Sequence, residues 1–113
     1  MRGGRANRQR GEIEAVIDGE RRILCMTLGA LAELETAFGV DNIAELAGRF
    51  EGGRVGTRDV MAIIAAGLRG GGNVLDDGDL ADVRVEGGIG GAIRLAARLL
   101  ESAFGGEEMP QNP

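Results

Sequence analysis

Few residues in this sequence combine the types and the spacing that catalysis or metal binding requires. The 113 residues include no His, Tyr or Trp, and Cys25 is the single cysteine. The commonest general base and metal ligand is therefore absent, and one thiol cannot form a structural zinc site within one chain. Every basic residue is Arg, so the lysine of a phosphate-binding loop and the amine of a Schiff base are absent too. We predict a protein that is not an enzyme, with no catalytic residue, no metal site and no cofactor.

Two glycine-containing segments match ligand-binding loops only in part. The run D-D-G-D at 76–79 has the composition of a calcium loop, but that alignment puts Leu75 and Arg84 where oxygen ligands are needed. A solvated helix start explains this run better. The run G-G-I-G-G at 87–91 opens a helix, as phosphate loops do, yet no credible strand precedes it and the dinucleotide fingerprint is incomplete. We expect 87–91 to be a hinge or to permit tight packing.

The other reactive side chains lie in structural contexts. Cys25 falls in an apolar strand with no His to activate it, so we expect a buried, unreactive thiol. Glu33 and Glu35 are two residues apart on a predicted helix and point to different sides, which is poor geometry for an acid–base pair. We expect both carboxylates to be solvated.

Charge is distributed unevenly along the chain. Residues 1–10 carry arginines and no acidic residue, whereas the whole chain has a net charge of −5. We expect 1–10 to be a flexible basic arm, 11–105 a single domain and 106–113 a polar tail. The arm could contact phosphates, but no sequence-reading element accompanies it and the body is acidic, so nucleic acid is not the expected partner. The arginines of the arm are Arg2, Arg5, Arg8 and Arg10.

The cellular setting follows from the cysteine count and from hydropathy. A single cysteine forms no internal disulfide, which agrees with a reducing, cytoplasmic setting. No apolar run approaches the ~20 residues of a membrane span, and no apolar segment of a signal peptide follows the basic start. We expect a cytoplasmic protein that does not associate with membranes.

The elements that must position these residues begin with a β-hairpin over 12–27. Two apolar, strand-like runs flank Asp18-Gly19, the dipeptide that best suits a two-residue hairpin turn. This register places Ile13 opposite Leu24, on the face that carries Ala15 and Ile17. Because an isolated hairpin is barely stable in water, helices must cover that face.

Helical periodicity then predicts helices over about 28–38, 42–51, 58–69, 77–84 and 89–104. We expect N-caps at Thr27, Asp41 and Thr57, and a glycine stop at Gly39. The fold class is α+β, an N-terminal β-hairpin packed on a mainly helical domain of four to five short helices. We place Leu28, Leu31, Ile63 and Leu68 in the core, with Leu80 and Val83 of the short acidic helix pointing inward. The predicted apolar face of the last helix comprises Ile89, Ala92, Ile93, Ala96, Leu99, Leu100 and Ala103.

Three segments resemble a known family. They are G-E-I-E-A-V-I-D-G at 11–19, L-C-M-T-L-G-A-L-A-E-L-E-T-A-F-G-V at 24–40 and D-V-M-A-I-I-A-A-G-L-R-G-G-G at 59–72. Together they are similar to the small tail-assembly protein of bacterial gene transfer agents and related long-tailed phages, also labelled a tail tube protein and generally regarded as a tail-assembly chaperone. The resemblance covers about residues 7–105.

The resemblance implies a nonenzymatic and transient function. Such chaperones coat the helical tape-measure protein, keep it soluble, and give way as tail-tube subunits polymerise around it. The expected partners are therefore the tape-measure protein and the major tail tube protein, with self-association left open. The partner-binding residues are unknown from sequence; we hypothesise a groove between the third and last helices, where spaced apolar side chains could receive another helix.

Two alternatives remain at this point. A structural tail tube subunit needs extensive β-sheet, whereas this chain offers one hairpin. A small DNA-binding regulator would use the arginine-rich arm, and the acidic body argues against it.

Overall fold

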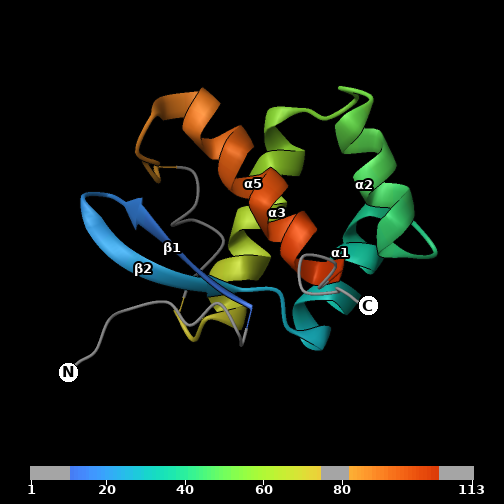
Figure 1. The fold of residues 1–113 in the computed structure, drawn as a ribbon, viewed down its shortest axis with the longest axis horizontal. Coiled ribbons are helices and arrows are strands. Elements are labelled where there is room, and N and C mark those ends of the chain that lie inside the picture. The colour runs from blue at the N-terminus through green and yellow to red at the C-terminus, as the bar shows by residue number, and fades with distance from the viewer. Residues whose placement is uncertain (1–10, 75–81, 105–113) are drawn as a thin grey trace, which may run out of the picture.

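The computed structural model describes residues 11–74 and 82–104, and it shows an α+β fold (Figure 1). Several predictions from the sequence lie outside these residues. They are the basic arm at 1–10, the polar tail at 106–113, the acidic run at 76–79 and the inward position of Leu80.

The N-terminal hairpin consists of β1 (Glu12–Ile17) and β2 (Glu20–Cys25). Asp18 and Gly19 both have positive φ, 54° and 80°, as a type I′ turn requires. Ile13 pairs with Leu24 in the antiparallel register, and both are buried. The predicted turn, register and core face of the hairpin are therefore confirmed.

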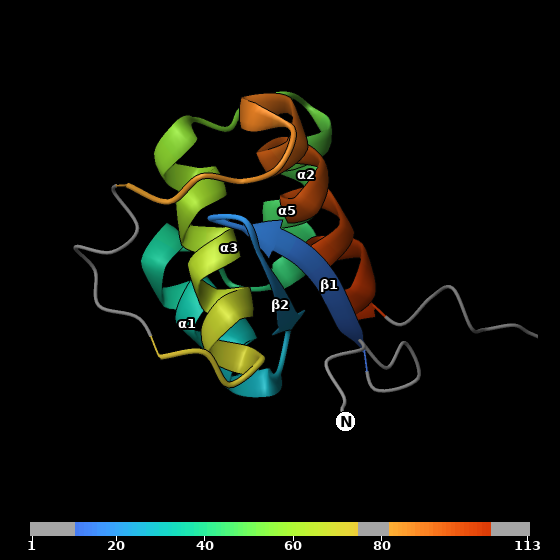
Figure 2. The ribbon, with the colours of Figure 1, turned by 90° about the vertical axis from the view of Figure 1, so that its left-hand side faces the viewer.

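Four helices follow the hairpin in the described part of the chain. They are α1 (Leu28–Phe38), α2 (Ile43–Glu51), α3 (Thr57–Gly70) and α5 (Gly88–Phe104). Helices α3 and α5 pack against the hairpin. Helix α3 is central, since it contacts α1, α5 and β2 (Figures 1 and 2). The helix bounds differ from the predicted ones by one residue at most.

Helix α3 also contributes more buried hydrophobic residues to the core than any other described element. Ile63 and Leu68 are fully or almost fully buried, as predicted, and Leu31 packs half-buried against them. The prediction that Leu28 lies in the core is wrong, because its side chain is 85% exposed. At 100° per residue, Leu28 lies about 120° around the helix axis from the buried Leu34, so the apolar stripe of α1 turns away from its first residue.

The N-caps agree with the sequence at one helix and differ at two. Thr27 caps α1, its Oγ1 accepting from the Ala30 N–H at 3.1 Å. The predicted cap at Asp41 is wrong: Asn42 is the N-cap of α2, and its side chain accepts from the Glu45 N–H at 2.9 Å. The predicted cap at Thr57 is also wrong, because Thr57 is already helical in α3.

The N-cap of α3 is Gly56, held by a carboxylate three residues along. The Gly56 N–H donates to Oδ2 of Asp59 at 2.8 Å, so the acidic residue in the first turn fixes the cap backbone. At the other end of α1, Gly39 adopts the left-handed conformation at φ 64°, which confirms the predicted glycine stop.

In the segment 82–86 the end of the predicted helix at 77–84 is wrong, and residues 77–81 of that prediction lie outside the described residues. Asp82 to Arg84 are not helical, and Val83 packs half-buried against the core. The Asp18 N–H donates to the Arg84 carbonyl at 2.7 Å, and Val85 forms an antiparallel bridge with Ile17. These tertiary hydrogen bonds to the hairpin hold the backbone extended and override the local preference for helix. Figure 2 shows the segment passing the turn end of the hairpin before it enters α5.

Candidate partner-binding groove

An apolar groove of about 480 Å³ lies between α3 and α5. Its third wall is the extended segment 83–85. The lining residues are Thr57, Val60, Met61, Ile64, Val83, Arg84, Val85, Gly88, Ile89 and Ala92. A groove therefore exists where the sequence led us to hypothesise one.

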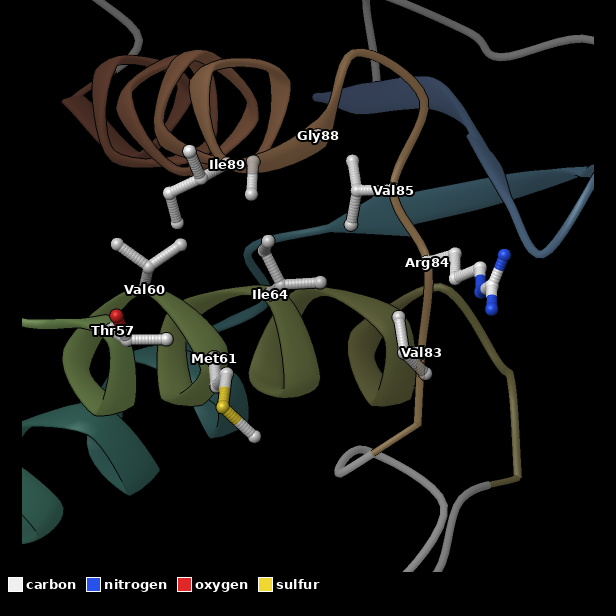
Figure 3. Close-up of a pocket in the computed structure, with 10 residues that line it drawn as sticks. Thr57, Val60, Met61, Ile64, Val83, Arg84, Val85, Gly88 and Ile89 are labelled. Atoms are coloured by element: carbon white, nitrogen blue, oxygen red, sulfur yellow. The ribbon is translucent and has the colours of Figure 1, made fainter.

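The groove has a buried floor and an exposed apolar lip. Val60 and Ile64 form the floor and are each only 3% exposed, whereas Ile89 at the lip is 60% exposed. Figure 3 shows Val60, Ile64, Val85 and Ile89 directed into the space between the helices, while the charged end of Arg84 points away from it. The accessible surface inside the groove is therefore mostly hydrocarbon, which suits an apolar side chain from another protein.

The hairpin turn fixes the third wall. Oδ1 of Asp18 accepts from the Arg84 N–H at 2.9 Å, in addition to the backbone bond from the Asp18 N–H to the Arg84 carbonyl. Asp18 of the type I′ turn thus forms hydrogen bonds with both the N–H and the C=O of Arg84. The groove is consequently connected to the N-terminal hairpin, more than 60 residues away in sequence.

Glycines permit the close approach of α5 to this wall. A Cβ at Gly91 would overlap with the carbonyl oxygen of Glu86, and Gly87 and Gly88 have φ of 91° and 67°. Of the two expectations for the glycine-rich run, hinge or tight packing, the packing at Gly91 agrees with the second.

The groove continues into an exposed apolar stripe on α5. We define the α5 stripe as Ile89, Ile93, Ala97 and Phe104, which lie within about 80° of one another around the helix axis. Ile93 is 41% exposed and Phe104 is 52% exposed. The stripe ends at a smaller depression of about 130 Å³ between α5 and α2. Residues lining that depression are Ala47, Phe50, Glu51, Ala97, Leu100, Glu101 and Phe104.

The stripe refines the predicted apolar face of α5. Ala92, Ala96, Leu99 and Leu100 are buried as expected, but Ile89 and Ile93 lie at the margin of that face. Leu95, which the sequence reading left out, is buried too. The apolar surface of α5 is therefore wider than its contact with the core, and the surplus is the α5 stripe. The wide apolar arc of this helix in the sequence already indicated that part of it would remain exposed.

The remaining candidate residues are not brought together. Cys25 is half-buried in β2, less completely than expected. Glu33 forms an ion pair with Arg69 of α3, which ties α1 to α3. Among the described residues no group of three His, Cys, Asp or Glu side chains could hold a metal ion, and no described helix is long and apolar enough to cross a membrane.

The fold and this surface define a small α+β protein that combines a two-stranded hairpin with an exposed apolar groove. The chain belongs to the family described as "Phage tail tube protein, GTA-gp10", whose family model matches residues 10–106. This match confirms the resemblance to a gene transfer agent and phage tail family, and it makes the chain a phage tail tube-related protein. No curated protein and no solved structure matches the chain.

Proposed function

We propose that this protein is a tail-assembly chaperone that binds an amphipathic helical segment of the tape-measure protein. The observation that carries the proposal is the α5 stripe, which runs from the apolar groove between α3 and α5 to the depression beside α2. Family membership supports a function among tail proteins. The protein would act in the cytoplasm of the bacterial host, without catalysis and without a cofactor.

The spacing of the stripe suits a helical partner. Ile89, Ile93 and Ala97 are each four residues apart, the spacing at which side chains of two packed helices interdigitate. From Ile89 to Phe104 the stripe is about 22 Å long, at 1.5 Å per residue, or roughly four helical turns. A tape-measure helix of that length with apolar residues at i, i+4 and i+7 would cover it, and its first anchor would enter the groove.

The exposed area also suits transient binding. Three side chains of the stripe, Ile89, Ile93 and Phe104, are 41–60% exposed, and each gains roughly 25 cal/mol for every Å² removed from water. A few such side chains hold a partner without the large apolar interface of a permanent complex. The partner can therefore be released when tail tube subunits assemble around it.

Co-expression with the neighbouring tail proteins tests this function. The chain is produced together with the tape-measure and major tail tube proteins, followed by affinity pull-down and light scattering. We expect soluble tape-measure protein only when this chain is present, in a complex of defined stoichiometry. A tape-measure protein that is equally soluble without this chain contradicts the proposal.

A structural component of the tail tube is the second candidate. The description of its family as a tail tube protein favours it, whereas the sheet in the described part of the chain has two strands, fewer than stacked rings need. Electron microscopy of the purified chain separates the two candidates. Rings or tubes formed by this chain alone would support the structural candidate and argue against the chaperone.

A further inference from the structure

The two outer edges of the hairpin are treated differently by the fold. The edge of β2 is covered, since the Asn73 side chain donates to the Ile23 carbonyl at 2.9 Å, and the backbone of Gly70 and Gly71 packs on the Ile23 and Cys25 carbonyls. Covering an edge in this way prevents pairing with other strands.

The edge of β1 is covered at its turn end by the segment 82–86. The Val16 carbonyl accepts from the Glu86 N–H at 3.1 Å. In a hairpin with a two-residue loop, the N–H and C=O of Glu14 and the N–H of Val16 face outward. Within residues 11–74 and 82–104, no hydrogen bond reaches these three groups. In the described part of the chain they form a short open strand edge.

A groove of about 240 Å³ runs between this edge and α5, on the side of α5 opposite the α5 stripe. Figure 2 shows β1 as the strand of the hairpin nearer to α5. Ala15 and Leu95 form an apolar floor, and Arg94 and Arg98, one helical turn apart, form the outer wall. Glu14 and Glu86 also line the groove, on the side of the hairpin and the segment 82–86. Both arginines are exposed and make no ion pair in the described part of the chain. Glu14 itself is engaged by Arg21 at 2.9 Å.

We infer that this groove binds an extended, acidic segment of another protein, which adds to β1 as a third strand. The open backbone groups of Glu14 and Val16 would bond the main chain of that segment, the usual source of affinity in strand addition. Arg94 and Arg98 would pair with carboxylates at alternate positions, because alternate side chains of a strand point to the same face. The site is distinct from the α5 stripe and does not depend on the proposed chaperone function.

Charge selects this occupant over a second copy of the chain. A symmetric β1–β1 pairing centred on Glu14 would place two Glu14 side chains directly opposite each other, which is destabilising. Acidic side chains beside Arg94 and Arg98 would instead pair with two exposed cations that form no ion pair within the described residues.

Binding of a labelled peptide to the full chain tests the inference. The probe is a fluorescein-labelled octapeptide of alternating Thr and Glu. Its controls are the Thr–Lys octapeptide and a Thr–Glu octapeptide N-methylated throughout, which keeps the charge but cannot donate backbone hydrogen bonds. We expect the Thr–Glu peptide to bind at low salt, with slower amide hydrogen exchange at Glu14 and Val16. The affinity of each control peptide should be at least about tenfold lower than that of the Thr–Glu peptide.

Matched protein variants complete the test. Arg94→Gln/Arg98→Gln should weaken the Thr–Glu peptide about tenfold, whereas Arg49→Gln/Arg58→Gln, with the same change in net charge, should not. Three results would each overturn the inference. They are equal binding of the N-methylated peptide, unchanged binding by the Arg94/Arg98 variant, and a dimer of the free chain that the peptide disperses, which would assign the edge to a second copy.

Discussion

Neighbouring glycines at the start of α5 have different surroundings, and this difference can be measured. A Cβ at Gly91 would overlap with the Glu86 carbonyl, whereas a Cβ at Gly90 would meet only the end of the Arg94 side chain, at 3.5 Å. The packing argument therefore applies to one glycine and not to the other.

We predict that Gly91→Ala lowers the free energy of unfolding by about 1–3 kcal/mol, because the methyl group must displace the segment 82–86 from α5. Gly90→Ala is the matched control and should be neutral or stabilising by up to about 1 kcal/mol, since alanine favours the helix. Urea denaturation followed by circular dichroism measures both. Equal effects of the two substitutions would show that Gly91 does not permit a close contact.

Asp18 is the second residue whose contribution to stability can be measured by substitution. It combines a positive φ of 54° with a hydrogen bond to the Arg84 N–H. Asp18→Ala should cost about 2 kcal/mol, of which roughly half comes from the lost hydrogen bond and half from the left-handed backbone. Asp18→Asn keeps the acceptor and tolerates this backbone, so it should cost less than about 0.5 kcal/mol. If both variants are equally stable in urea denaturation, the turn does not anchor the groove wall.

At the scale of elements, the start of α2 depends on one amide side chain. Asn42 accepts from the Glu45 N–H, and Oε1 of Glu45 accepts from the Asp41 N–H at 3.1 Å. Asn42→Ala should therefore lower stability by about 1 kcal/mol. Asp41→Ala leaves the Asp41 backbone donor in place and should cost less than about 0.5 kcal/mol. Thermal denaturation of the two variants shows which substitution lowers stability more. A larger loss for Asp41→Ala would show that Asp41 is the N-cap.

Elements set by local signals could be predicted from the sequence. The Asp18-Gly19 turn determines the hairpin and its register, and Thr27 and Gly39 determine both ends of α1. At α2, by contrast, Asp41 and Asn42 are both good caps, and periodicity cannot separate adjacent candidates.

Elements set by tertiary contacts could not be predicted in this way. Residues 83–85 are extended because the hairpin supplies the hydrogen-bond partners of Arg84 and Glu86, and no local pattern encodes that pairing. The exposure of Leu28 has a similar cause, since the spacing of α1 leaves open which part of the apolar arc faces α3. For the site, the sequence located a groove between the third and last helices but not the exposure of Ile89 and Ile93.

On the scale of the whole molecule, α5 separates two surfaces of different chemistry. One side carries the α5 stripe and the apolar groove. The other side faces the edge of β1 and carries Arg94 and Arg98, which form no ion pair within the described residues. Helix α3, in which seven of fourteen residues are buried, supports both through its contacts with α5 and β2. The two surfaces can therefore be altered separately without disturbing the core.

The central claim is that the α5 stripe binds the tape-measure protein, and a paired substitution tests it most directly. Ile89→Gln/Ile93→Gln removes two exposed apolar side chains from the stripe, and Leu28→Gln, on α1 and 85% exposed, is the control for loss of apolar surface elsewhere. Each variant is mixed with tape-measure protein, and its affinity is measured by isothermal titration calorimetry. We predict that the affinity of the stripe variant is at least about tenfold lower than that of the wild type. Leu28→Gln should keep wild-type affinity, and both variants should keep the fold. Wild-type affinity of the stripe variant would contradict the account.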